Sequence, residues 1–311
     1  MTSIVTLTMN PSIDKSASVD HVVPDRKLRC GPPQHEPGGG GINVFRAIHK
    51  LGGESLALYC AGGPPGQMLR GLLDREGLVH HPIQIEGWTR ESLTVYEEST
   101  GQQFRFGMPG PSLRSEEWKR CLTELSTLDP TPDYIVASGS LPPDVPVDFY
   151  GRVAELAKER GARMILDTSG EPLRLALQKG IFLIKPNMRE FAELAGVEIT
   201  EESQQIRIAT EFIENHQAEA IIVSLGAGGA LAVHREGAVH LRAPTVRIES
   251  RVGAGDSMTA GVVLSLSRGF SLLEAARFGV AAGAAAVMTP GTQLCRREDT
   301  EKLYESSLSL E

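Results

Sequence analysis

The middle of the chain alternates short apolar runs of strand character with amphipathic helical patterns. The strand-like runs cover residues 134–137, 163–166, 182–184 and 220–224, and the helical patterns between them cover residues 149–160, 188–194 and 205–216. Each helical pattern is long enough to cross over between two parallel strands. The alternation therefore predicts an α/β fold in which a parallel sheet is covered by helices on both faces. Beyond it, the spacing of apolar residues predicts helices over 254–268 and 272–288.

Two segments do not follow this alternation. Residues 17–23, and residues 93–96 with 103–106 around the turn Ser99-Thr100-Gly101, have the composition of antiparallel strands. A sheet of so few strands has little hydrophobic backing and is not stable alone. We therefore expect a small lid sheet inserted into the main domain.

The composition narrows the class of protein. The 311 residues are 41% hydrophobic and 23% charged, which predicts a soluble globular protein with a substantial core. A net charge of -8 and only 5% aromatic residues argue against a nucleic-acid partner. Cys30, Cys60, Cys121 and Cys295 form no Cys-x-x-Cys pair, which favours free thiols in a reducing compartment. With no targeting or membrane-spanning pattern found, we expect a cytoplasmic protein without a membrane partner.

A glycine-containing segment, Arg251 to Ser257, precedes the first of the late helical patterns. Gly253 and Gly255, on either side of Ala254, allow a tight turn whose exposed N–H groups at a helix start would receive an anion. A carboxylate beside bound phosphate needs a chemical role because like charges repel, so we predict that Asp256 is a general base. The helix start is expected to depress the pKa of Asp256. The alternative is that Asp256 only caps the helix.

A second glycine cluster runs from Pro37 to Asn43 and precedes another helical pattern that ends near Gly52. Four successive glycines cost more backbone entropy than a turn requires, so a small polar ligand is expected to approach this backbone closely. Asn43 lies where its side chain could contact the same ligand. A flexible hinge is the alternative.

Other phosphate-binding signatures are missing from the sequence. It contains neither the Gly-Lys pair of a Walker A loop nor the Gly-x-Gly-x-x-Gly of a dinucleotide fold. The nearest glycine group is Gly226, Gly228 and Gly229, after the strand that ends at Ser224. A tight hairpin into residues 230–234 is an alternative explanation for Gly229.

These segments together resemble the ribokinase-like (phosphofructokinase B) family of sugar kinases. The matching motifs are Pro37 to Asn43, Val252 to Ser257, and Lys185-Pro186-Asn187-x-x-Glu190, and the similarity extends from Thr6 to Cys295. The resemblance implies a ribokinase-like three-layer α/β/α sandwich with a small β-sheet lid. It implies one kinase domain over 1–311, with lid strands inserted at about 15–36 and 88–108.

The resemblance also implies the reaction. Within the family, four segments look closest to 6-phosphofructokinases: Lys27-Leu28-Arg29, Trp88-Thr89-Arg90, Phe104-Arg105-Phe106 and Ser138 to Pro142. We therefore expect ATP-dependent phosphorylation of the C1 hydroxyl of fructose 6-phosphate, giving fructose 1,6-bisphosphate and ADP. A 1-phosphofructokinase and a tagatose-6-phosphate kinase remain alternatives, as does a non-catalytic sugar-phosphate sensor. A nucleotide-dependent oxidoreductase is disfavoured by the missing fingerprint.

Site residues follow from the motifs by resemblance. The catalytic set is Asp256 with Gly253, Ala254 and Gly255. The sugar-phosphate set is Asp14, Lys27, Gly38, Gly39, Gly40, Asn43, Arg90, Arg105 and Gly139. The ATP set is Lys185, Asn187, Ser224, Gly226 and Gly229. Two oxygens of Asp14 suit a pair of hydroxyls, and the two arginines suit a phosphate.

Metal ions and a partner are implied in the same way. Magnesium is expected to bind through water to Glu190 and Asn187, although these two residues would equally form a capping box at a helix start. A possible potassium ion would take oxygen atoms from Ser250, Val252, Ala286, Thr289 and Gly291. The lid is expected to pair two copies as a homodimer, with Lys27 extending toward a site across the interface.

Overall fold

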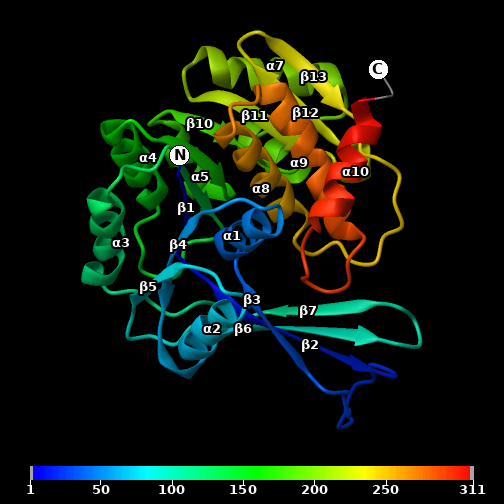
Figure 1. The fold of residues 1–311 in the computed structure, drawn as a ribbon. Coiled ribbons are helices and arrows are strands. Elements are labelled where there is room, and N and C mark those ends of the chain that lie inside the picture. Colours follow the sequence, from blue (N-terminus) through cyan, green and yellow to red (C-terminus); the bar gives the residue numbers. More distant parts are fainter. Residues whose placement is uncertain (1–2, 309–311) are drawn as a thin grey trace.

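A computed structural model describes residues 3–308 and contains a nine-stranded main sheet. Its strands are β1 (Ile4–Thr8), β4 (Leu56–Ala61), β5 (His80–Gln84), β8 (Tyr134–Ser138), β9 (Arg163–Asp167), β10 (Ile181–Ile184), β11 (Ala218–Ser224), β12 (Ala230–His234) and β13 (Gly237–Leu241). They lie in the order β13-β12-β11-β10-β9-β8-β1-β4-β5 (Figure 1). From β5 to β11 the pairing is parallel, as predicted. At one edge, β12 and β13 extend the sheet in antiparallel pairing, beyond the strands for which parallel pairing was predicted.

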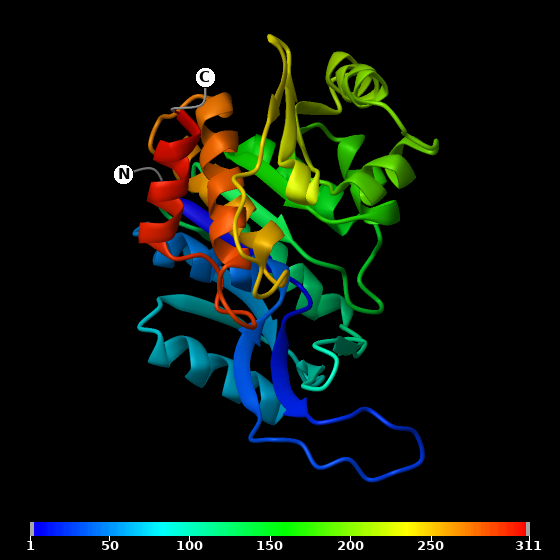
Figure 2. The same ribbon diagram turned by 90° about the vertical axis from the view of Figure 1, so that its right-hand side faces the viewer.

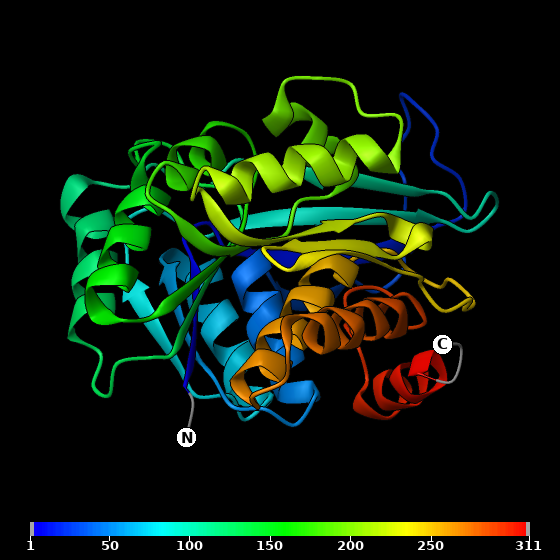
Figure 3. The same cartoon turned by 90° about the horizontal axis from the view of Figure 1, so that it is seen from above.

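Helices cover both faces of this sheet (Figure 3). One face packs against α3 (Ser115–Thr127), α4 (Phe149–Arg160), α5 (Gly170–Leu177), α6 (Met188–Ala195) and α7 (Glu202–Glu214). The other face packs against α1 (Gly40–Lys50), α2 (Gly63–Arg75), α8 (Ala254–Ser267) and α9 (Leu272–Val287), and α10 (Arg297–Leu308) packs on α9. The expected three-layer α/β/α arrangement is therefore confirmed.

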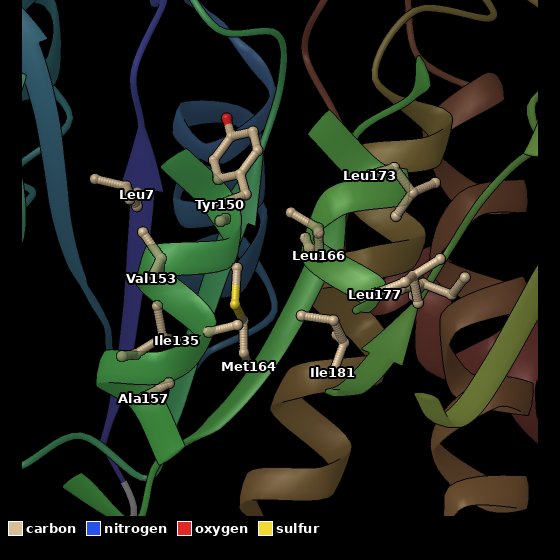
Figure 4. Packing of buried hydrophobic residues seen from close by; sticks show 14 of the residues in the cluster. Leu7, Ile135, Tyr150, Val153, Ala157, Met164, Leu166, Leu173, Leu177 and Ile181 are labelled. Atoms are coloured by element: carbon tan, nitrogen blue, oxygen red, sulfur yellow. The ribbon is translucent and has the colours of Figure 1, made fainter. Parts of the chain in front are cut away.

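The packing of α4 shows how the sequence produces this layering. Tyr150, Val153 and Ala157 follow one another at the spacing of one helix face, and all three are buried. In Figure 4 they face the strand residues Ile135 and Met164. Burying a side chain of the size of Val153 stabilises the fold by about 1.5–3 kcal/mol, so this stripe fixes α4 on the sheet.

A second, four-stranded sheet covers one end of the main sheet. It contains β2 (Ser12–Val19), β3 (Gln34–Gly38), β6 (Arg90–Glu97) and β7 (Gln103–Gly107), in the order β3-β2-β6-β7. The expected antiparallel pairing holds for β6 with β7. It was wrong for residues 17–23, because the strand begins at Ser12, ends at Val19 and pairs in parallel with β6. Strand β3 was not predicted as a separate strand, and it ends in the Pro-Gly pair assigned to the glycine cluster.

The small sheet lies over the edge where the parallel strands of the main sheet end, as the views in Figures 1 and 2 show. In an open α/β sheet, ligands bind beyond this carboxyl edge. The loop between β2 and β3 extends away from the rest of the molecule (Figure 2). Within residues 3–308, no helix is long and apolar enough to cross a membrane.

Candidate active site

A cavity of about 830 Å³ lies between the small sheet and the carboxyl edge of the main sheet. It is large enough for a small phosphorylated ligand. The predicted site residues that line it are Asp14, Gly39, Gly40, Asn43, Arg90, Arg105, Gly139, Glu190, Val252, Gly253 and Asp256. Lining residues that were not predicted include Ser12, Ser92, Ser138, Asp167, Thr168, Arg251 and Thr292. The fold thus brings residues from both glycine motifs and from the lid to one cavity.

Asp256 lies in the first turn of α8, whose N-cap is Gly253. Gly253 has a φ of 75°, a left-handed conformation that favours glycine. Since Gly253 occupies the cap position, helix capping does not explain Asp256. Its Oδ2 accepts a hydrogen bond from Asn43 Nδ2 at 2.9 Å, which joins the start of α8 to the start of α1.

The carboxyl group of Asp256 has a raised pKa. Burial raises it most and the carboxylate of Asp167 adds to the effect, while Asn43 and Lys185 oppose it, so that the pKa reaches about 6. The predicted depression of this pKa was wrong, because desolvation and a second carboxylate outweigh the helix start. A carboxyl group with a pKa near 6 is ionised at neutral pH and is a stronger base than an exposed aspartate.

Asp167 and Lys185 form a buried ion pair beside Asp256. Lys185 Nζ lies 3.1 Å from Asp167 Oδ2, and Thr259 Oγ1 donates to the same oxygen at 3.2 Å. Burial alone would lower the pKa of Lys185, but Asp167 and Asp256 are among the carboxylates that raise it overall. The lysine was expected to contact a nucleotide phosphate, whereas here it balances a carboxylate. Asp167 was missed, although an aspartate directly after a predicted strand was a usable signal.

The glycine cluster allows the chain to approach itself. A methyl group added at Gly40 would lie 2.3 Å from Ser138 Oγ, and one added at Gly41 would lie 2.4 Å from Thr8 Oγ1. At Gly38 it would lie 2.3 Å from Asp14 Cγ. These glycines were predicted to let a ligand approach the backbone closely. The structure places protein atoms there, so the glycines are required first for packing α1 against the strand ends.

Polar side chains of the lid face the cavity from above. Ser12 Oγ donates to Asp14 Oδ1 at 2.7 Å, and burial raises the pKa of Asp14 while Arg90 and Arg105 oppose the rise. Arg90 donates through Nε and Nη2 to the carbonyl of Asn10 at 3.3 Å each. These contacts fix one carboxylate and one guanidinium at the lid side of the cavity.

Two neutral groups complete this end. Asn43 is 5% exposed, and within the described chain its Oδ1 has no hydrogen-bond partner, which leaves an acceptor beside the cavity. Gly139 has a φ of 105°, and its N–H donates to the carbonyl of Asp167 at 3.0 Å. Its own carbonyl accepts from Tyr150 Oη at 2.8 Å. Gly139 therefore presents a fixed backbone turn to the cavity.

Asn187 and Glu190 form the capping box of α6. Asn187 Oδ1 accepts from the Glu190 N–H at 2.9 Å, and Glu190 Oε2 accepts from the Asn187 N–H at 2.9 Å. The structural alternative considered for this pair is thus present. Glu190 nevertheless lines the cavity, whereas Asn187 is exposed beside it.

The other predicted nucleotide residues lie next to Asn187, outside the lining of the cavity. Asn187 forms an isolated β-bridge with Ser224 at the end of β11. Gly226 and Gly229 belong to the turn that leads into β12, and a methyl group added at Gly229 would lie 1.9 Å from the Leu241 carbonyl oxygen. The hairpin alternative for Gly229 is therefore also present in the structure.

The remaining predicted residues lie behind the turn at Gly253, the N-cap of α8, or far from it. Ala254 and Gly255 are the first residues of α8, and the predicted potassium residues come from two adjacent segments. Ser250 N–H donates to the carbonyl of Val287 at 3.2 Å, and Thr289 Oγ1 donates to the carbonyl of Ala286 at 2.8 Å. Gly291 follows in the same loop, and among the five predicted potassium residues Val252 lines the cavity. Lys27 is exposed in the loop between β2 and β3.

Comparison with known proteins places the chain in a family. The family model described as pfkB family carbohydrate kinase matches residues 5–299. The ATP-dependent 6-phosphofructokinase isozyme 2 of Mycobacterium tuberculosis is 46% identical over 302 residues, which are 97% of this chain and 89% of that protein. The isozyme 2 of Escherichia coli is 41% identical over 305 residues, 98% of both chains.

Solved structures agree with these relatives. Phosphofructokinase-2 from Escherichia coli in complex with fructose-6-phosphate matches with a TM-score of 0.94 and 40% identity, covering 99% of this chain and 100% of that one. Arabidopsis thaliana ribokinase complexed with ribose and ATP matches with a TM-score of 0.80 at 19% identity, covering 98% of this chain and 99% of that one, and so shares the fold. The cavity, the two glycine motifs and the full-length matches together show that the chain belongs to the pfkB family of carbohydrate kinases.

Proposed function

We infer that the chain is an ATP-dependent 6-phosphofructokinase, which transfers the γ-phosphoryl group of ATP to the C1 hydroxyl of fructose 6-phosphate. The observation that carries this is Asp256, a base held in the first turn of α8 and facing the same cavity as Asp14 and Arg90. A sensor would not need such a base. Among curated relatives, the 1-phosphofructokinase of Bacillus subtilis is 34% identical and the tagatose-6-phosphate kinase of Staphylococcus epidermidis 32%, below the 46% of the first-named relative.

The sugar phosphate binds at the lid end of the cavity. Asp14 and the unpartnered Oδ1 of Asn43 accept hydrogen bonds from sugar hydroxyls. Arg90 and Arg105 bind the phosphate, since guanidinium groups form bidentate bonds to phosphate oxygens. Gly39 and Gly40 contribute backbone groups around the sugar, and the turn at Gly139, whose N–H and carbonyl are already paired within the protein, borders the sugar site. Asp14 and Arg90 are already held in place by Ser12 and Asn10, so little order has to be imposed when the sugar binds.

Phosphoryl transfer takes place at the start of α8. Asp256 accepts the proton of the C1 hydroxyl as the hydroxyl attacks the γ-phosphorus. The N–H groups of Gly253, Ala254 and Gly255 point out of the helix start and stabilise the charge that develops on the transferred group. In a loose transition state the nucleophile needs positioning more than early deprotonation, and the hydrogen bond from Asn43 fixes the carboxylate for this.

The nucleotide lies across α6 and the turn after β11. Ser224, Gly226 and Gly229 contact its phosphates, with Asn187 beside them through the β-bridge. Lys185 acts indirectly. Its ammonium group is paired with Asp167, and it opposes the rise in the pKa of Asp256.

Magnesium fits this site as an ion shared with the nucleotide. Within residues 3–308 no cluster of three or more His, Cys, Asp or Glu could hold a metal, which suits magnesium bound by one or two carboxylates and by phosphate oxygens. Glu190 and Asp167 line the cavity and would hold it, whereas Asn187 already uses its amide oxygen in the capping box. When bound, magnesium neutralises phosphate charge. Potassium would bind between the Ser250 and Ala286 segments.

We further propose that two copies pair through the outer face of the lid. In the register of the sheet, Ala17, Val95 and Phe104 are neighbours on one face, while the cavity-lining residues Asp14, Ser92 and Thr94 lie on the other. An apolar sheet face of this kind needs cover. The partner would bring its Lys27 loop toward the site. Phe104→Glu is expected to give a monomer by light scattering, and a wild-type monomer at micromolar concentration would exclude the dimer.

A coupled assay of ADP release tests the function. Fructose 6-phosphate, fructose 1-phosphate and tagatose 6-phosphate are offered separately with ATP, and we expect the highest kcat/KM for fructose 6-phosphate. The product should be fructose 1,6-bisphosphate. Preference for fructose 1-phosphate would favour a 1-phosphofructokinase. Binding of sugar phosphate without ADP release, in a preparation of native fold, would favour the sensor.

A further inference from the structure

Glu36 joins the lid to a loop near the C-terminus. It lies on β3 directly opposite Asp14 in the register of the small sheet. Its Oε2 accepts from the Thr292 N–H at 3.4 Å and also from Thr292 Oγ1. Thr292 is 9% exposed and lines the catalytic cavity. One carboxylate oxygen thus connects a lid strand to a segment 256 residues further along the chain.

That segment is packed tightly against the catalytic turn. Leu294 is fully buried and has a φ of 63°, a left-handed conformation in which the Cβ of leucine is strained. A methyl group added at Gly253 would lie 2.5 Å from Leu294 Cδ2. Strained residues persist where their surroundings fix them, and they are concentrated at functional sites. Leu294 therefore supports the N-cap of α8 from behind.

The body of the protein holds the other side of this loop. Thr289 Oγ1 donates to the carbonyls of Ala286 at 2.8 Å and Leu294 at 3.0 Å. The Cys295 N–H donates to Ser257 Oγ at 3.3 Å, inside α8. The loop is therefore fixed to α8 and α9 by its ends, while Thr292 at its middle is held by the lid.

We propose that Glu36 is a positioning residue for phosphoryl transfer, which acts through Thr292 and Leu294 to hold the Gly253 turn in place when the lid is in contact with the body. The inference rests on the proposed function, since it assigns the N–H groups of this turn to the transferred phosphoryl group. It explains why a half-buried carboxylate lies opposite Asp14, where two like charges would otherwise be unfavourable. A shift of the turn lowers the rate of transfer and leaves nucleotide binding intact.

The test compares Glu36→Ala, Thr292→Val and the double variant by steady-state kinetics at saturating KCl. We expect kcat to fall about tenfold in each single variant, with KM for ATP unchanged, as for an interaction that matters in the transition state. The double variant should be no slower than the slower single variant, because both remove the same contact. Glu36→Gln keeps an acceptor oxygen and should recover most of kcat. Glu219→Ala, an exposed strand glutamate near the opposite end of β11, is the matched control.

Three results would overturn the proposal: unchanged kcat, additive losses, or an effect confined to KM for fructose 6-phosphate. If Glu36→Ala does not fold, Thr292→Val carries the same test, because it removes only the hydroxyl donor, and Thr292→Ser should then retain wild-type kcat. A wild-type enzyme that releases no ADP with any sugar phosphate would refute the proposed function instead, before any variant is compared.

Discussion

Replacing Asp256 by asparagine tests the proposed role of this residue as the general base. The amide oxygen of the new side chain can still accept the hydrogen bond that Asn43 Nδ2 donates to Asp256 Oδ2 at 2.9 Å. The side chain keeps its size and its position in the first turn of α8. What it loses is a basic oxygen facing the cavity. The substitution therefore removes the proton acceptor with little change in the shape of the sugar site.

The expected loss in kcat follows from this difference. General base catalysis contributes typically about 10²–10⁴-fold, and Asp256 has a pKa of about 6, closer to neutral pH than an exposed aspartate has. We therefore expect kcat of Asp256→Asn to fall by roughly 10²–10⁴, with KM for fructose 6-phosphate changing by less than about threefold. The coupled ADP assay at pH 7.5 measures both, and unfolding curves verify the fold.

The pH profile provides a second, independent measurement. Below pH 6 the free enzyme loses the ionised form of Asp256, so kcat/KM falls on the acid side. The phosphate group of the substrate also ionises near pH 6, as phosphate monoesters do, and adds a second proton. The wild-type slope should therefore approach two on a logarithmic plot and the Asp256→Asn slope should approach one. Residual kcat above about a tenth of wild type, or identical slopes, would refute the assignment of Asp256 as the base.

Three further predictions concern stability and packing. The pKa of Asp256 is raised from 3.8 to about 6, so the folded protein binds this proton more tightly than the unfolded chain does. The stability that results is present below pH 3.8 and lost as the pH rises through 6. Urea unfolding should therefore show Asp256→Asn more stable than wild type by roughly 1–3 kcal/mol at pH 8, with no advantage near pH 4. Lys185→Met leaves Asp167 buried without its counter-charge and should lower the free energy of unfolding by about 3–5 kcal/mol. Adding Asp167→Asn should recover most of this loss, and equal stability of the single and double variants would contradict the prediction. Gly40→Ala should abolish most activity because of the clash with Ser138 Oγ, and Ser138→Ala in the same chain should restore part of it; wild-type turnover of Gly40→Ala alone would show that the loop can give way.

The parts of the fold that were predicted well are those with local signals. The helix over 149–160 was predicted at its exact bounds, because its apolar spacing is regular and Gly161 ends it in a left-handed conformation. The lid was predicted as an element, with the β6–β7 hairpin correct but the pairing of β2 wrong. Its β2 and β6 lie some seventy residues apart in the chain, and their parallel register depends on contacts that no local pattern contains. Strand β3 was likewise not predicted, because its pairing with β2 is not visible in the local sequence and its last two residues belong to the glycine cluster.

The candidate site shows the same contrast between local signals and long-range contacts. Motifs were enough to place Asp14, Asn43, Arg90 and Asp256 around one cavity. They were not enough to predict the electrostatics, because the pKa of Asp256 depends on Asp167, which arrives on a different strand and was not considered. A helix start acts through partial charges near the surface, whereas burial and a full neighbouring charge act more strongly.

The two glycine motifs are best understood as one arrangement. Gly40 and Gly41 allow the start of α1 to pack against Ser138 and Thr8, and only this close packing brings Asn43 to Asp256. With a side chain at either glycine, α1 would move outward by more than a hydrogen bond tolerates. The base would then lose the donor that orients it and that opposes the rise in its pKa. The first motif thus acts on the proton transfer as well as on the sugar. A variant such as Gly41→Ala should lower kcat and should also shift the acid limb of the kcat/KM profile to a pKa above 6.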